Sequence, residues 1–153
     1  MAAATAGSCG AMHGAVLGVS DSMGLSDEDT TKALMIFGLI CVFIAAHSTF
    51  VAEVGGCQAE CGSGSTLAAA AIVGLAGGTV NQSISAASIA LQSSLGIICD
   101  PIGNRVESYK NVMAASNALS SINMALADYN HSIPLDEVIE TIYEVGKSIP
   151  NTL

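Results

Sequence analysis

An uncharged apolar run, Ala33–Ala46, constrains the fold of this chain more than any other feature. It extends over 14 residues, whereas a helix that crosses a bilayer needs about 20. This length favours a fully buried core helix over a membrane span. Because a helix without a polar face must be enclosed by other helices, the rest of the chain or a partner has to surround it.

The apolar residues of this chain are mostly small or aliphatic. Hydrophobic residues make up 51 % of the 153 positions, but aromatic residues only 4 %, and there are 16 glycines. Small residues let helices approach closely, whereas a β-sandwich needs more aromatic and β-branched residues in alternation. We therefore expect one domain, residues 1–153, built as an all-α, compact bundle of mostly buried helices with glycine-rich cluster loops.

Local signals place the expected helices. The capping boxes Ser26–Asp29 and Thr79–Gln82 each predict a helix start, and a proline at the first helical position predicts another at Pro134. The last helix carries an amphipathic stripe of apolar residues. The helix that begins after Ser26 is expected to end at about Ala46, the one after Thr79 near Gly96, and the one at Pro134 near Gly146. Two further helices are expected from Leu67 to about Leu75 and from Asn111 to about Ala127. Thr5–Gly10 is expected to be a small-residue loop.

Charge and cysteine usage exclude several classes of partner. The net charge is −9 with only four Lys and Arg, so we expect no nucleic-acid partner and no binding to an acidic membrane surface. Five cysteines is an odd number, and the N-terminus has no secretory pattern. A reducing cytoplasm is therefore the expected location, without a disulfide framework.

Three cysteines are candidates for a metal site. Cys57 and Cys61 lie four residues apart among glycines, and Cys99 stands at the start of a Cys-Asp-Pro turn. The first two would share one face of a helix, or lie close together in a glycine turn. Converging thiolates could hold zinc or an iron–sulfur cluster. The alternative is that all three are small buried core residues.

Five segments resemble one enzyme family in order along the chain: TAGSCG, AEVGGCQAECGSGS, CDPIGNRVE, KNVMAASNALSSINMALA and IPLDEVIETIYEVGKSIP. They are similar to the C-terminal half of the α chain, or α domain, of iron–sulfur-dependent L-serine dehydratases. The resemblance extends from Thr5 to Pro150. Cysteine-desulfidase-like proteins share part of the same glycine and helix pattern, and are the nearest alternative.

The resemblance implies a lyase site with a 4Fe–4S cluster. Three cysteines would hold the cluster, and its open iron would act as a Lewis acid on the β-hydroxyl of L-serine, giving pyruvate and ammonia. Cys57 matches the first cluster ligand and Cys99 the second. Thr5, Gly7 and Ser8 match a loop that can present N–H groups and hydroxyls to the substrate carboxylate. The general base is not identified.

The third cluster ligand is missing from its usual place. In the family a Pro-Cys pair follows the Val-Glu pair, but here Val106-Glu107 is followed by Ser108-Tyr109. Cys61 is the candidate substitute. More distant candidates are Cys9 and Cys41, with Glu60 or Glu107 as oxygen ligands.

The remaining polar candidates have simpler explanations. His47 could serve as a base, but a hydrogen-bonded residue at a helix end is the favoured interpretation. Arg105 and Lys110 could pair with Glu107 or with a substrate carboxylate, and a surface salt bridge is the favoured interpretation for both.

The family comparison also predicts missing partners. The family's α region has a helical segment before the Thr5 loop, and a β chain or β domain in which we expect the base. We therefore expect a homo- or hetero-oligomer, and a chain that is catalytically silent alone. Two alternatives stay open: a non-catalytic helical subunit or fragment without a cluster, and a small membrane protein.

Overall fold

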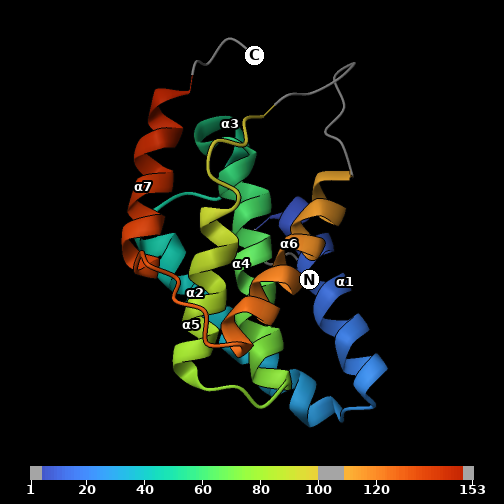
Figure 1. The fold of residues 1–153 in the computed structure, drawn as a ribbon. Coiled ribbons are helices and arrows are strands. Elements are labelled where there is room, and N and C mark those ends of the chain that lie inside the picture. Colours follow the sequence, from blue (N-terminus) through green and yellow to red (C-terminus); the bar gives the residue numbers. More distant parts are fainter. Residues whose placement is uncertain (1–4, 100–108, 150–153) are drawn as a thin grey trace.

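The computed structural model describes residues 5–99 and 109–149. Within these ranges the chain forms seven α-helices and no strand (Figure 1). This confirms the all-α fold class. The helices are α1 (Ala6–Met23), α2 (Asp27–His47), α3 (Ala52–Gly55), α4 (Cys57–Leu75), α5 (Val80–Gln92), α6 (Tyr109–Leu126) and α7 (Leu135–Ser148).

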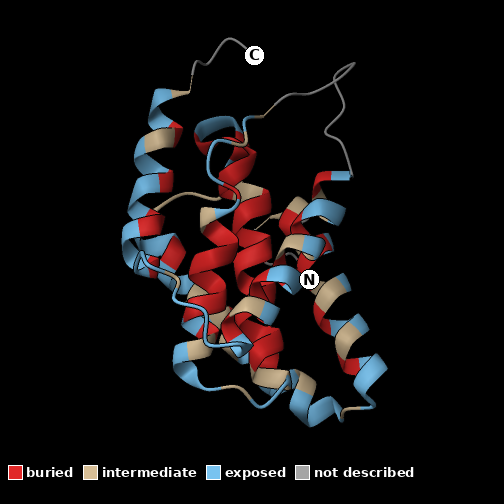
Figure 2. Cartoon of the chain, in the orientation of Figure 1, coloured by how far each residue is buried: buried red, intermediate tan, exposed pale blue. Residues whose placement is uncertain are grey.

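Helix α4 is the centre of the bundle and contacts each of the other six helices described. From Cys57 to Val73 every residue except Glu60 is buried, and the ribbon of α4 is mostly red in Figure 2. Its alanines Ala68–Ala71 have no exposed surface at all. Such a helix can be enclosed on all sides because its small side chains let the neighbouring helices approach closely.

Two glycines of α4 mark the closest of these approaches. A Cβ on Gly62 would collide with the Ser94 side chain, and a Cβ on Gly64 would lie 3.0 Å from Cα of Ser8. These contacts join α4 to the segment after α5 and to α1. Gly62 and Gly64 therefore lie inside a helix and make room for its neighbours.

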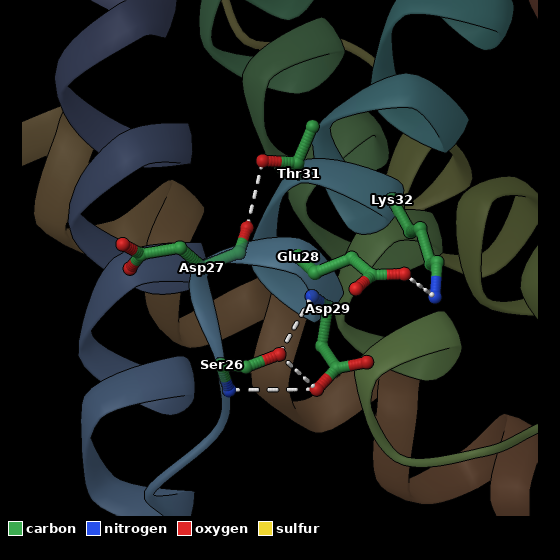
Figure 3. A network of polar contacts seen from close by, with 6 residues as sticks. All are labelled: Ser26, Asp27, Glu28, Asp29, Thr31 and Lys32. Carbon is green, nitrogen blue, oxygen red and sulfur yellow. Dashed lines mark hydrogen bonds and ion pairs between the residues drawn. The ribbon is translucent and has the colours of Figure 1, made fainter.

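Reciprocal capping boxes start three helices. Thr5 with Ser8, Ser26 with Asp29, and Thr79 with Gln82 begin α1, α2 and α5. Figure 3 shows the second, where the Ser26 hydroxyl accepts from the Asp29 N–H and the Asp29 carboxylate accepts from Ser26. The same turn carries an exposed ion pair between Glu28 and Lys32 at 2.8 Å. The two boxes predicted from sequence are confirmed.

Two expected boundaries were wrong. The segment Thr5–Gly10 is the first turn of α1 and not a loop, because Thr5 satisfies the Ser8 N–H as an N-cap. Helix α4 begins at Cys57, ten residues before its expected start at Leu67. Cys57 and Cys61 therefore lie on one face of a helix, which the sequence had left open.

The apolar helix α2 is less buried than expected. Its buried residues are Ala33, Phe37 and Ile44, whereas Leu39 is 74 % and Val42 69 % exposed. The expectation of a fully buried core helix was wrong, because the small residues of α4 occupy the centre and cover only one side of α2. Within the described ranges α2 alone has the length and hydropathy of a membrane span, a criterion that core helices and signal sequences also satisfy.

Candidate metal centre

The three candidate cysteines meet at the N-terminal end of α4. Cys57 and Cys61 occupy its first turns, and Cys99 belongs to the segment that follows α5. Cys57 has no exposed surface, Cys61 is 5 % exposed, and both pack with Ala11 of α1 and Ala114 of α6. Cys99 packs against the same cluster with intermediate exposure. The structure therefore brings all three thiols into one small, largely buried cluster, the thiol pocket.

The approach of Cys99 depends on Gly56. This residue has φ +75° and ψ 173°, and a Cβ there would lie 2.9 Å from the Ile97 carbonyl oxygen. The absence of a side chain lets the Ile97 carbonyl accept the Gln58 N–H at 2.8 Å. Since α4 has no side-chain cap, this carbonyl satisfies one of its free first-turn N–H groups. The segment that carries Cys99 is thereby attached to the start of α4.

The three thiols interact with one another. The hydrogen bond between Cys57 and Cys61 raises the pKa of Cys57 and lowers that of Cys61, and burial further raises the pKa of Cys57. The pKa of Cys99 is raised by its burial and by the charge and hydrogen bond of Cys57. Of Cys57 and Cys61, Cys61 is therefore the more acidic thiol.

A buried ammonium group closes the pocket. Lys110, on the first turn of α6, is only 5 % exposed, and its Nζ donates to Cys57 Sγ at 3.5 Å and to the Ile98 carbonyl at 3.3 Å. Its charge opposes the rise in the pKa of Cys57. The expectation of a surface salt bridge for Lys110 was therefore wrong. A cation here favours thiolate over thiol in the pocket.

The predicted substrate-binding residues Thr5, Gly7 and Ser8 lie at the N-terminus of α1, beside α4. Thr5 Oγ1 donates to Glu60 Oε1 at 2.6 Å, and the Ser8 hydroxyl completes the Thr5 capping box. A Cβ on Gly7 would lie 2.8 Å from the same carboxylate oxygen. A carboxylate of the chain itself thus occupies this helix N-terminus, where negative charge is stabilised.

The other predicted candidates lie apart from the thiol pocket. Cys9 contacts Nδ1 of His13 at 3.1 Å on its own helix, and Cys41 packs beside the main core from α2. His47 bonds the Phe43 carbonyl at 2.9 Å at the end of α2, which confirms the helix-end interpretation. Arg105 and Glu107 lie outside the described residues.

The thiols fit an iron–sulfur cluster in their chemistry but are not arranged as a ready-made site. Soft thiolates are the ligands that such clusters use, and three of them converge here. Across 5–99 and 109–149, however, no group of three or more His, Cys, Asp or Glu side chains has the arrangement of a metal site. Cys57 hydrogen-bonds to the other two thiols and accepts from Lys110 instead, so cluster binding would require the thiols to lose their protons and these bonds to break.

Sequence reasoning missed two residues of this site. Gln58 was treated only as part of a motif, and the structure places it, fully buried, between Cys57 and the segment of Cys99. Lys110 was considered, but as a surface residue. A weak signal existed for Lys110, since it is one of only four Lys and Arg residues in the chain.

Comparison with known proteins identifies the family of the chain. The family model described as "Serine dehydratase alpha chain" matches residues 1–153. The chain belongs to the serine dehydratase alpha-chain family. It is 41 % identical over 152 residues to the probable L-serine dehydratase, alpha chain, of Bacillus subtilis, and 38 % identical over 156 residues to the L-serine dehydratase, alpha chain, of Peptoniphilus asaccharolyticus.

The match covers most of this chain but only part of those relatives. The match to the Bacillus protein includes 97 % of this chain and 51 % of that protein. The match to the Peptoniphilus protein includes 100 % of this chain and 53 % of that protein. The probable L-serine dehydratase, alpha chain, of Latilactobacillus sakei is 38 % identical to this chain, and the match includes 73 % of that protein. The chain therefore spans about half the length of the first two relatives.

Proposed function

We propose that this chain is the cluster-binding component of an iron–sulfur-dependent L-serine ammonia-lyase. The convergence of Cys57, Cys61 and Cys99 at the start of α4 carries the proposal. These three residues would hold a 4Fe–4S cluster, with Cys61 in place of the missing third cysteine. When bound, the cluster supplies a Lewis-acid iron for the β-hydroxyl of L-serine.

The residues around the thiols have defined parts in this proposal. The N-terminus of α1, with Thr5, Gly7 and Ser8, would orient the substrate carboxylate through its N–H groups and hydroxyls. Glu60 occupies that end now, and the substrate carboxylate would have to displace it. The apolar walls formed by Ala11 and Ala114 would exclude water from the sulfurs.

The companion of this chain is also part of the proposal. The names of its relatives include an alpha chain, which implies a β chain or domain, and the general base would come from there. The exposed apolar side of α2, which includes Met35, Leu39 and Val42, supports burial against such a partner or against further α-chain sequence. We place the assembled enzyme in the cytoplasm.

A pair of cysteine variants tests the ligand assignment. Cys57→Ala should abolish iron retention after anaerobic reconstitution, because it removes the central thiol. Cys41→Ala is the matched control, since Cys41 lies on α2 outside the thiol pocket, and should leave iron content unchanged. Equal iron in both variants would show that the cluster, if present, is bound elsewhere.

A second candidate function is a helical subunit without a cluster. The contact between Lys110 and Cys57 favours it, because an ammonium group already donates to the sulfur that would otherwise bind iron. Such a subunit would retain its fold and bind its partner without iron. Retained iron that is lost in Cys57→Ala would exclude this alternative.

A further inference from the structure

We infer that Gln58 is a positioning residue that holds Cys99 beside Cys57. Its side chain has no exposed surface and bridges two parts of the chain distant in sequence. Its Oε1 accepts the Gly96 N–H at 2.8 Å, and its Nε2 donates to the Ile142 carbonyl of α7 at 3.2 Å. Both ends of the amide are therefore used, and each bond fixes one orientation of the side chain.

Main-chain bonds complete the attachment of the Cys99 segment. The Gln58 N–H bonds the Ile97 carbonyl, so one residue binds both Gly96 and Ile97. Lys110 binds the next carbonyl, that of Ile98. Three consecutive residues before Cys99 are thus fixed relative to α4 and α6, which determines where the Cys99 sulfur lies.

The bond to α7 gives Gln58 a role beyond the local turn. Because Ile142 is buried in the core, the Gln58 amide is anchored at its far end. Without this anchor the side chain could rotate away from the Gly96 N–H. Any movement of α7 would therefore reach the Cys57–Cys99 pair through one side chain.

Disulfide trapping tests the inference without any metal. The experiment uses a Cys61→Ser background, and the oxidised chain is cleaved after Glu53, Glu60 and Glu107. Cys57 is then the only cysteine of peptide 54–60, and Cys99 is the only cysteine of peptide 61–107. Diamide is the oxidant: each thiol gives up one proton and one electron to it, the disulfide forms, and diamide becomes the hydrazine. Mass spectrometry of the joined peptides gives the rate.

Gln58→Met should slow this disulfide by about tenfold, the effect of losing one net hydrogen bond on a local equilibrium. The matched control is Gln92→Met. Gln92 is the last residue of α5, and its side chain bonds Ser88 and the His131 carbonyl, not Gly96, Ile97 or Ile98. This substitution should leave the rate unchanged. Equal rates in the two variants would overturn the inference.

A measurement on the unaltered chain applies even if Gln58→Met does not fold. The Gly96 N–H donates to Gln58 Oε1, so its hydrogen exchange should be as slow as that of core amides in α4. Exchange at the rate of an open loop would contradict the inference.

A cobalt titration extends the test to metal binding, and this part rests on the proposed function. Gln58→Met should lower the thiolate-to-cobalt charge-transfer absorption to the level of Cys99→Ser, because Cys99 no longer reaches the metal. Absorption equal to that of the unaltered chain would count against the inference. If the unaltered chain binds no cobalt, the proposed function is weakened, whereas the disulfide result still decides the role of Gln58.

Discussion

Replacing Gly56 by alanine should destabilise the chain by about 2–6 kcal/mol, from two separate causes. The backbone at φ +75° and ψ 173° is a conformation that residues with a side chain rarely adopt, which costs about 1–3 kcal/mol. The new Cβ would also lie 2.9 Å from the Ile97 carbonyl oxygen. Because that oxygen is backbone and is bonded to Gln58, it cannot move freely, and overpacking adds about 1–3 kcal/mol.

Gly24→Ala separates these causes. Gly24 has φ +64° at the end of α1, and a Cβ there would meet nothing within 4 Å. It should cost only the conformational strain, about 1–2 kcal/mol. Urea unfolding, followed by circular dichroism, gives the unfolding free energies of both variants, provided that the dependence of the free energy on urea concentration is the same in each. If Gly56→Ala costs no more than Gly24→Ala, the Ile97 carbonyl does not pack on Gly56, and the reasoning about the approach of Cys99 fails.

Three further predictions concern the scaffold. Ser26→Ala should lower the unfolding free energy by about 1 kcal/mol in urea titration, because the N-cap of α2 is lost; no change would contradict the capping geometry. Hydrogen bonds with Ser26 lower the pKa of Asp29, so the stabilisation it provides is present above its ordinary value of 3.8 and is lost as pH falls through the lower folded value. The stability difference between the unaltered chain and Asp29→Asn should therefore shrink below pH 3.8, and a pH-independent difference would be inconsistent with this. Asn117→Ala should cost about 1–3 kcal/mol, since its amide joins α6 to α4 and α5, and thermal unfolding at an unchanged temperature would refute that link.

Local chemistry explains what could be predicted from the sequence. The capping boxes at Ser26 and Thr79 depend on residues only three positions apart, and both begin helices as expected. The amphipathic stripe of α7 also predicted its buried face, with Val138, Ile139 and Ile142 inside. The first helix residue is Leu135, one position after the expected Pro134.

Contacts between distant segments explain what could not. The start of α4 was misplaced because one of its first N–H groups, that of Gln58, is satisfied by the Ile97 carbonyl, 39 positions later in the sequence, and not by a local side chain. The glycines Gly62 and Gly64 resembled turn signals, but they serve close helix packing. The sequence of α2 is apolar on all sides of the helix, which predicts that the helix is buried. It does not show which part of this chain, or which partner, covers each side.

The candidate site was predictable in its cysteines and not in their surroundings. Cys57, Cys61 and Cys99 were chosen from spacing and family resemblance, and the structure brings them together. The position of Lys110 depends on the packing of α6 against α4, which no local pattern reveals. Pockets of this kind combine residues from separate helices, so only the tertiary structure defines their charge balance.

The most direct test of the account is the iron and acid-labile sulfide content of the chain after anaerobic reconstitution. The account predicts about four irons per chain with visible charge-transfer absorption that bleaches in air. It also predicts that Cys57→Ala loses both. A chain that folds and retains no iron would contradict the cluster-binding function and favour the cluster-free helical subunit.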